Sequence, residues 1–321
     1  MTRLPKLAAL LGQIVFPAGS LLAAAAAVLV LSNGHSLAAS GAVDDTQSVS
    51  PAQVHAAVVA AATIKRVPGD LQPDLVHASN DNERLHNEDC AAGRAKQDAT
   101  FGECVYGDRG SKREVVLFGD SHAGMWFDGL KAAATAAHWK FQIFYKAGCP
   151  IVELNFYSSR DRSFKGCGAW RDSAIAAIRK IRPTLVVVTS GTFEQPVASD
   201  RFANASEWAQ GLTHTLNRLK EPKTRLAVLG DIPRLAQSAP ECLAAHQSDA
   251  QACATPVADA YAGVLVQAER DAAKATGALR VNVAPWLCAA TCPAIVGHIL
   301  VYRNQFHISA TYSIFLSGAL R

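Results

Sequence analysis

The sequence predicts an α/β fold, a three-layer α/β/α sandwich around a mainly parallel sheet, preceded by one N-terminal transmembrane helix. Two observations predict the sandwich. Short apolar runs that suit buried strands alternate with longer helical patterns, and this alternation is typical of a parallel sheet covered on both faces. Half of the 321 residues are hydrophobic and 18% are charged, so the chain can bury a sizeable core. A third observation, a long uncharged N-terminal stretch, predicts the membrane helix.

This apolar stretch covers residues 7–31 without a charged side chain. As a helix it is long enough to cross a hydrocarbon core of about 30 Å. Arg3 and Lys6 precede it and two aspartates follow it, which places the N-terminus in the cytoplasm and the rest of the chain outside. The alternative is a cleaved signal peptide with its cleavage site at residues 36–38, although the apolar region of such a peptide is shorter, about 7–15 residues.

The chain after the membrane stretch divides by composition into two parts. We expect residues 1–35 to form the transmembrane helix and residues 36–85, rich in Ala, Ser, Asp and Pro, to form an extracytoplasmic linker. A helix-compatible stretch at residues 51–64 lies within this linker. Residues 86–321 are expected to form the folded domain. The predicted location is therefore the cell membrane, single-pass, with the C-terminal domain extracytoplasmic.

The strands and helices of the domain follow one another in a regular order. The first strand candidate, EVVLF, is closed by a Gly-Asp pair, which suits a buried strand. The strand candidates are residues 114–118, 140–145, 184–189, 225–230 and 279–283. The helix candidates are residues 122–138, 170–181, 206–219, 256–276 and 310–320. In such a sheet, functional residues belong at the C-terminal ends of the strands.

The eight cysteines all follow the apolar stretch, and their even number is typical of a disulfide framework in an oxidising compartment. The simplest pairing joins sequence neighbours. These pairs are Cys90–Cys104, Cys149–Cys167, Cys242–Cys253 and Cys288–Cys292. None of them has the C-x-x-C spacing of zinc sites, so we expect no metal and no cofactor. The net charge of +4 forms no basic stripe of the kind that binds nucleic acid.

The most informative stretch is the predicted strand-to-helix junction at Gly119-Asp120-Ser121-His122. A serine here is exposed at the sheet edge, and its own N–H can point at a developing oxyanion. Gly119 permits a tight backbone, and Asp120 caps or braces the turn. His122 is expected to have a structural role or to lie at the edge of the substrate site, and not to act as the base. His307 lies on a loop before the last helix candidate, from which it could take the serine proton and return it to a leaving group.

These residues resemble a known family. The GDSH motif with the distal His307-Ile308-Ser309 resembles the SGNH (GDSL-type) hydrolase superfamily, and the GDSH variant resembles the SGNH domain attached to membrane acyltransferase-3 (O-acetyltransferase) proteins. The resemblance runs from about residue 90 to the C-terminus and implies that Ser121 is the nucleophile and His307 the base. Further segments that carry it are residues 101–104, 146–150, 230–234, 285–288 and 301–303.

The resemblance also implies an oxyanion hole, which this chain matches only in part. In the family the serine N–H, a glycine of the second block and an asparagine of the third block donate to the oxyanion. Gly148 corresponds to the glycine, but residues 190–193 contain no asparagine after the glycine. We therefore expect the donors to be Ser121 and Gly148, assisted by Thr192, with Asp120 beside them.

A second departure concerns the acidic residue of the family, which lies three positions before the histidine. That position holds Asn304. In serine proteases such an exchange lowers turnover about ten-thousandfold by favouring the wrong imidazole tautomer. Three readings stay open: a slow Ser-His pair, another group that orients His307, or lost catalysis. Without context, Ser121 would be a helix cap and His307 a structural histidine.

The resemblance leads to a functional expectation. We expect a membrane-anchored O-acyltransferase that moves acyl groups, with acetyl as the first candidate, onto extracytoplasmic cell-envelope carbohydrate through an acyl-enzyme. The expected partners are a glycan or polysaccharide acceptor and an integral-membrane acyltransferase, because the chain, with one apolar segment, corresponds to a truncated or split form of the family's larger proteins. The alternatives are a carbohydrate O-acetyl esterase and a catalytically degenerate glycan-binding domain.

Overall fold

The computed structural model describes residues 49–87, 104–157, 166–198 and 200–321. The apolar stretch at residues 7–31 and Cys90 lie outside these residues, so the membrane helix and the Cys90–Cys104 pair stay predictions. Within the described ranges, no helix is both long and apolar enough to cross a membrane.

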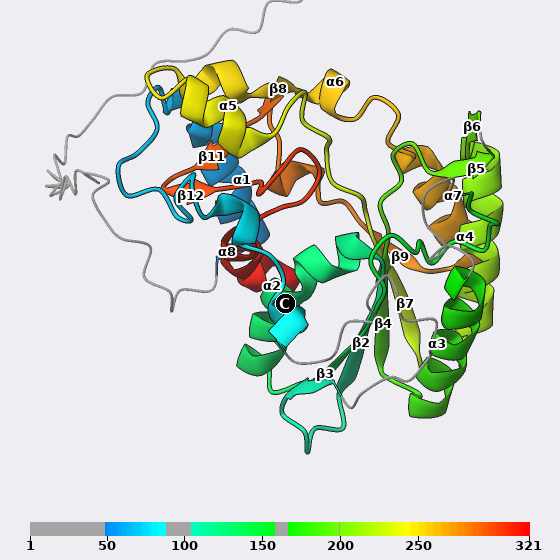
Figure 1. Cartoon of the computed structure of the whole chain (residues 1–321). Helices are drawn as coiled ribbons and strands as arrows, with labels where there is room; N and C mark the ends of the chain where they lie inside the picture. The colour runs from blue at the N-terminus through cyan, green and yellow to red at the C-terminus, as the bar shows by residue number, and fades with distance from the viewer. Residues whose placement is uncertain (1–48, 88–103, 158–165, 199) are drawn as a thin grey trace, which may run out of the picture. The chain divides into compact units, whose positions relative to one another are not determined.

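The centre of the domain is a six-stranded sheet with the order β1-β3-β2-β4-β7-β9 (Figure 1). Its strands are β1 (Val105–Gly107), β2 (Glu114–Gly119), β3 (Lys140–Tyr145), β4 (Leu185–Thr189), β7 (Arg225–Leu229) and β9 (Leu279–Val281). The short edge strand β1, which the sequence did not predict, pairs antiparallel with β3, and all other neighbours are parallel. The predicted α/β fold with a mainly parallel sheet is confirmed.

Most of the helices form where the sequence predicts them. They are α1 (Pro51–Ala60), α2 (Ser121–Ala136), α3 (Cys167–Ile181), α4 (Ala205–Leu219), α5 (Ala239–Ala245), α6 (Val257–Ala260), α7 (Val266–Thr276), α8 (Ala310–Phe315) and α9 (Ser317–Leu320). The single helix expected over residues 256–276 is wrong. It is broken into α6 and α7 because Gly263, between them, has a left-handed backbone with φ +80°. The stretch at residues 310–320 is likewise divided, into α8 and α9.

Short two-stranded ribbons lie outside the main sheet. They are formed by β5 (Pro196–Ala198) with β6 (Arg201–Phe202), β8 (Thr255–Pro256) with β10 (Thr291–Cys292), and β11 (Ile295–Val296) with β12 (Ile299–Leu300).

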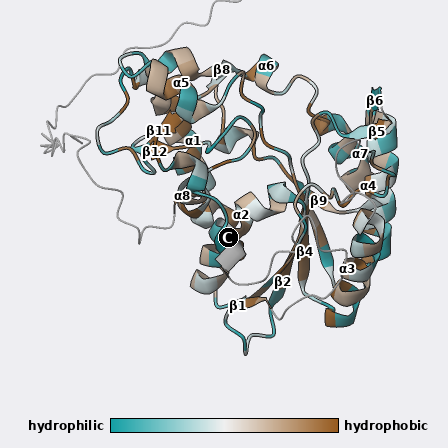
Figure 2. Ribbon diagram, viewed as in Figure 1, coloured by the Kyte–Doolittle hydropathy of each residue, from teal (hydrophilic) through white to brown (hydrophobic). Residues whose placement is uncertain are grey.

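The alternating side chains of the strands build two cores. On β2, Val116 and Phe118 point to the face covered by α3, α4 and α7, whereas Val115 and Leu117 point to the face covered by α2. Figure 1 shows these helices on opposite sides of the sheet, and Figure 2 shows apolar strands between them. Because both faces are buried, the strands appear in the sequence as continuous apolar runs.

The segment predicted as a linker is in part a piece of the domain, which corrects the expected boundary at residue 86. Helix α1 begins with a capping box between Ser50 and Gln53, and its Val54 and Val58 are buried in the core. Gln72 pairs with Ile299 of β12, so residues 49–85 are folded together with the rest. The sequence concealed this because α1 is a run of alanine and valine without a polar face that would mark an amphipathic helix.

Candidate active site

Ser121 is the first residue of α2, directly beyond the end of β2. Asp120 caps this helix: its Oδ1 accepts the N–H of His122 at 2.8 Å, and its Oδ2 accepts the N–H of Gly191, just after β4, at 3.1 Å. Burial raises the pKa of the Asp120 carboxyl to about 6. Asp120 therefore braces the junction between two strands, and it is not an exposed substrate contact.

The Ser121 side chain is partly exposed to solvent. Ser121 is only partly buried, and its hydroxyl makes no hydrogen bond to any residue in the part of the chain that the structure describes. Its backbone N–H belongs to the first turn of α2, where no intrahelical acceptor is available. Both groups face the positive end of the helix dipole, which favours negative charge near the serine.

His307 is delivered to the same edge by the chain that leads into α8. The bridge between Tyr302 and Ile308 closes its loop, and Ser309 caps α8, which packs on α2. The buried imidazole of His307 lies 5.2 Å from that of His122, measured between ring centroids. The structure thus brings His307 to the start of α2, without a hydrogen bond to Ser121. Such bonds often tighten only when substrate is bound.

Asn304 holds the loop of His307 and contacts its ring. Its Oδ1 accepts the N–H groups of Phe306 and His307, at 3.0 and 2.9 Å. Its Nδ2 lies 3.2 Å from the Nδ1 of His307, and its Oδ1 lies 3.3 Å from that atom. Because the Oδ1 of Asn304 already accepts two backbone N–H groups, its Nδ2–H group is the better partner for Nδ1 of the His307 ring. This arrangement favours the tautomer with a hydrogen on Nε2, which is unsuited to a general base.

Gly148 lies in the loop that follows β3 and has a left-handed backbone with φ +68°. Its N–H donates no hydrogen bond among the described residues. The loop is tied to β2 by the N–H of Lys146, which donates to the carbonyl of Gly119 at 3.2 Å. Gly148 therefore keeps a free backbone donor on a loop attached to the serine strand, as expected for an oxyanion hole.

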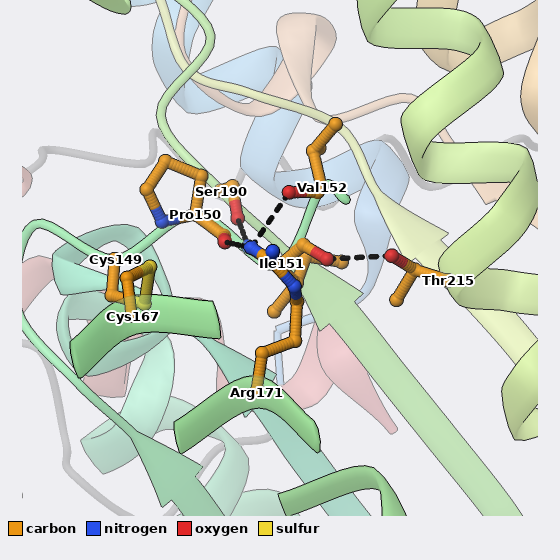
Figure 3. Close-up of a disulfide and its surroundings, with 8 residues drawn as sticks. All are labelled: Cys149, Pro150, Ile151, Val152, Cys167, Arg171, Ser190 and Thr215. Carbon is orange, nitrogen blue, oxygen red and sulfur yellow. Dashed lines mark hydrogen bonds between the residues drawn. A yellow bond between two sulfur atoms is a disulfide. The ribbon is translucent and has the colours of Figure 1, made fainter. Parts of the chain in front are cut away.

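The remainder of this loop is fixed by a disulfide and by side chains from two helices and from the residue after β4 (Figure 3). The Cys149–Cys167 disulfide joins it to α3, and Arg171 of that helix donates to two carbonyls of the loop at 3.0 and 2.8 Å. Ser190 accepts the N–H of Ile151 at 3.0 Å, and Thr215 of α4 donates to the carbonyl of the same residue at 2.6 Å. Such fixed loops preorganise backbone donors.

Between residues that the structure describes, two further disulfides are Cys242–Cys253 and Cys288–Cys292. Together with Cys149–Cys167, they are pairs of sequence neighbours that the spacing of the cysteines led us to expect.

Thr192 does not have the role that we expected. Its N–H and its hydroxyl both donate to Oδ2 of Asp231, at 2.7 and 2.9 Å, so neither is available to an oxyanion. The other carboxylate oxygen of Asp231 lies 2.6 Å from Nδ1 of His122. The sequence placed Asp231 after a strand end, but nothing in it indicated that this carboxylate pairs with a histidine 109 positions earlier.

A second carboxylate, that of Glu269, binds the backbone of Asp231. Glu269 of α7 accepts the N–H of Asp231 at 2.9 Å and a hydrogen bond from Arg280 at 2.7 Å. Burial and the charge of Asp231 raise the pKa of Glu269 to about 7.

The segment before residue 87 also contributes to the site. Buried Glu83 accepts hydrogen bonds from Tyr145, at the end of β3, and from Arg303, next to Asn304, at 2.9 and 3.3 Å. The Oδ2 of Asp81 accepts the N–H of Thr311 in α8 at 2.9 Å. These contacts hold the histidine loop from outside, and sequence patterns do not reveal them because they span up to 230 positions. Across the described ranges, no cluster of three or more His, Cys, Asp or Glu side chains could hold a metal ion.

Comparison with known proteins agrees with this geometry. The model of a family described as "SGNH domain (fused to AT3 domains)" matches residues 87–321. The chain belongs to this family. A comparison of the SGNH chain with curated protein sequences finds no significant match.

The fold is shared with a solved structure, and others are similar over part of the chain. The SGNH chain is similar to the periplasmic domain of a lipopolysaccharide acetyltransferase from Salmonella ser. Paratyphi A, with 15% identity and a TM-score of 0.57 over 77% of this chain and 95% of that one. A carbohydrate esterase family 2 enzyme from Corynascus matches with 15% identity and a TM-score of 0.42 over 65% and 64% of the two chains. A GDSL-like lipase from Bacteroides thetaiotaomicron matches with 14% identity and a TM-score of 0.38 over 65% and 85%.

Proposed function

We propose that this SGNH chain is an extracytoplasmic O-acyltransferase that acts on cell-envelope carbohydrate through an acyl-enzyme on Ser121. The observation that carries the proposal is the meeting of Ser121, at the start of α2, with the histidine loop of residues 303–309 at one sheet edge. The free hydroxyl of Ser121 and the fixed donor of Gly148 support the same reading.

The reaction consists of two acyl transfers. The Oγ of Ser121 attacks the acyl carbonyl carbon, its proton passes to His307, and the carbonyl electron pair moves onto oxygen. When that pair returns, the bond to the leaving group breaks, and His307 protonates the departing oxygen. A sugar hydroxyl then attacks the acyl-enzyme by the same steps and releases Ser121. The N–H groups of Ser121 and Gly148 stabilise the negative oxygen in both halves.

The N-terminal sequence supports the proposed location, and the matching family supports the proposed partner. The uncharged stretch at residues 7–31 supports a membrane anchor with the domain on the outer side. Members of the matching family are fused to AT3 domains, which supports an integral-membrane acyltransferase as the donor partner. The similar Salmonella domain is the periplasmic domain of a lipopolysaccharide acetyltransferase, which supports an acetyl group and an envelope glycan.

Two alternatives have specific support. A carbohydrate esterase would use the same residues, with water in place of the sugar hydroxyl in the second transfer. A catalytically inactive glycan-binding domain is favoured by Asn304, whose amide faces the Nδ1 of His307 where the family has an acid.

The full chain, purified in detergent and supplied with p-nitrophenyl acetate, distinguishes these functions. The proposal expects slow turnover that Ser121→Ala abolishes and that changes when a glycan acceptor is added. Serine-dependent hydrolysis without any effect of the glycan would favour the esterase. Equal rates in the wild type and in Ser121→Ala would rule out both enzyme readings.

A further inference from the structure

The site contains a second imidazole, His122, that the proposed reaction leaves unused. Its Nδ1 lies 2.6 Å from Oδ1 of Asp231, and both side chains are nearly inaccessible. Asp231 is in turn surrounded by donors: besides His122, the N–H of Ile232 donates to its Oδ1, and Thr192 donates twice to its Oδ2. These contacts fix the orientation of the Asp231 carboxylate and leave it as the acceptor that faces Nδ1 of His122.

The partners of His122 fix the hydrogens on its ring. Because Asp231 only accepts, Nδ1 must carry a hydrogen, and Nε2 carries one only if the ring is an imidazolium. Burial lowers the pKa of His122, but the charge and hydrogen bond of Asp231, with the charge of Asp120, outweigh burial and raise it despite Arg303. The ring of His307 also packs on His122, with 5.2 Å between the ring centroids.

The Nε2 atom of His122 is the second hydrogen-bonding atom of the ring. None of the residues described by the structure accepts a hydrogen bond from it. The ring packs against Gly191, whose missing Cβ would lie 2.9 Å from Nε2. His122 follows Ser121 directly on α2, and neighbouring positions on a helix do not face each other, so the geometry disfavours His122 as the base that takes the serine proton.

We propose that His122, held as an imidazolium by Asp231, donates its Nε2–H to the oxyanion that forms when Ser121 attacks an acyl carbonyl. This inference rests on the proposed function and adds a charged donor to the N–H groups of Ser121 and Gly148. No proton leaves His122. The carbonyl electron pair moves onto oxygen, is stabilised there, and returns as the leaving group departs. A charged donor suits this task because charge-assisted hydrogen bonds are the stronger ones.

Nitrogen-15 NMR of the histidine rings tests the protonation state without any turnover. The resonances of His122 are assigned by their loss in His122→Gln. In the full-length wild type at neutral pH, both ring nitrogens should carry hydrogen, and in Asp231→Asn the Nε2 hydrogen should be lost. A neutral His122 ring in the wild type would overturn the proposal, since Nε2 would then be an acceptor.

Turnover of p-nitrophenyl acetate tests whether His122 acts as a donor to the oxyanion. His122→Leu should lower kcat about 100- to 1000-fold with little change in KM, the effect of removing one oxyanion donor, and His122→Gln should recover part of it through its amide N–H. An unchanged kcat in His122→Leu, with turnover still abolished by Ser121→Ala, would overturn the donor role and leave the proposed function standing. Turnover that survives Ser121→Ala would contradict the proposed function, and the donor role with it.

Discussion

Two imidazoles lie side by side at the sheet edge, and their partners differ by one atom. Asp231 offers His122 a carboxylate oxygen at 2.6 Å, whereas Asn304 offers His307 an amide nitrogen at 3.2 Å. The first arrangement stabilises a cation, and the second favours a tautomer that cannot take a proton at Nε2. The proposed enzyme should therefore turn over slowly because of the Asn304 side chain, whose Oδ1 still holds the backbone of the histidine loop.

The substitution Asn304→Asp should accelerate turnover. An aspartate would keep one oxygen on the N–H groups of Phe306 and His307 and place its second oxygen where the amide nitrogen now lies. It would then orient the imidazole for proton transfer, and kcat for p-nitrophenyl acetate should rise by up to about four orders of magnitude. Asn304→Ala, which frees the loop, serves as the control and should lower kcat. A rate for Asn304→Asp no higher than that of the wild type would show that the Asn304 amide is not what limits turnover.

Asp120 should make the fold less stable as the pH rises. Its pKa in the folded chain, about 6, lies above the ordinary value of 3.8, so the folded state holds the proton longer than the unfolded state. The free energy of unfolding should fall between about pH 4 and pH 7, and His122, whose pKa is also raised, acts in the same direction. Urea unfolding of the wild type and of Asp120→Asn across this range tests the effect. The variant should lose less stability, and equal losses in the two proteins would refute the assignment.

At the level of elements, the site depends on how closely β2, β4 and α2 meet. A Cβ at Gly119 would lie 2.1 Å from the carbonyl oxygen of Thr189 and 2.7 Å from the Cβ of Ala123. Only a glycine lets β2 turn into α2 at this point without displacing β4. The position of Ser121 is thus set by the residue two places before it.

Gly119→Ala should destabilise the chain by about 1–3 kcal/mol, the typical effect of overpacking, and should lower serine-dependent turnover as the junction shifts. Gly168→Ala is the matched control, because no atom within 4 Å would meet its Cβ. In helix α3 that exchange should be neutral or stabilising by up to about 1 kcal/mol. Thermal unfolding compares the two, and equal effects would mean that the junction is not tightly packed.

The elements that the sequence predicted best are those buried on both faces. The strands β2, β3, β4 and β7 appear as apolar runs, and the motif around Ser121 falls at the end of the first of them. The break between α6 and α7 was missed because a helical pattern continues through Gly263. Pairs such as His122 with Asp231 were missed because a contact across 109 positions leaves no local periodicity.

For the molecule as a whole, residues 49–86 form part of the folded domain. Helix α1 contributes buried valines to the core, and Glu83 binds Arg303 beside the histidine loop. The family match begins at residue 87, so this segment adds support from outside the matched region. A chain that begins at residue 87 should therefore be less stable than the full chain.

Two valines of α1 test this packing with the same substitution. Val54 is fully buried, while Val59 is 50% exposed. Val54→Ala should lower the free energy of unfolding by about 2 kcal/mol, close to the value of burying such a side chain, and Val59→Ala should change it little. Denaturant unfolding of both variants measures this difference. If Val54→Ala left the free energy of unfolding unchanged, residues 49–85 would be better described as a linker.

The central claim is that Ser121 carries the acyl group. Mass spectrometry of the full chain after rapid acid quench of a reaction with p-nitrophenyl acetate tests it most directly, because a slow deacylation lets the adduct accumulate. We expect an acetyl group on the peptide that contains Ser121, absent from Ser121→Ala. An unmodified Ser121 during serine-dependent turnover, or an equal adduct in both proteins, would contradict it.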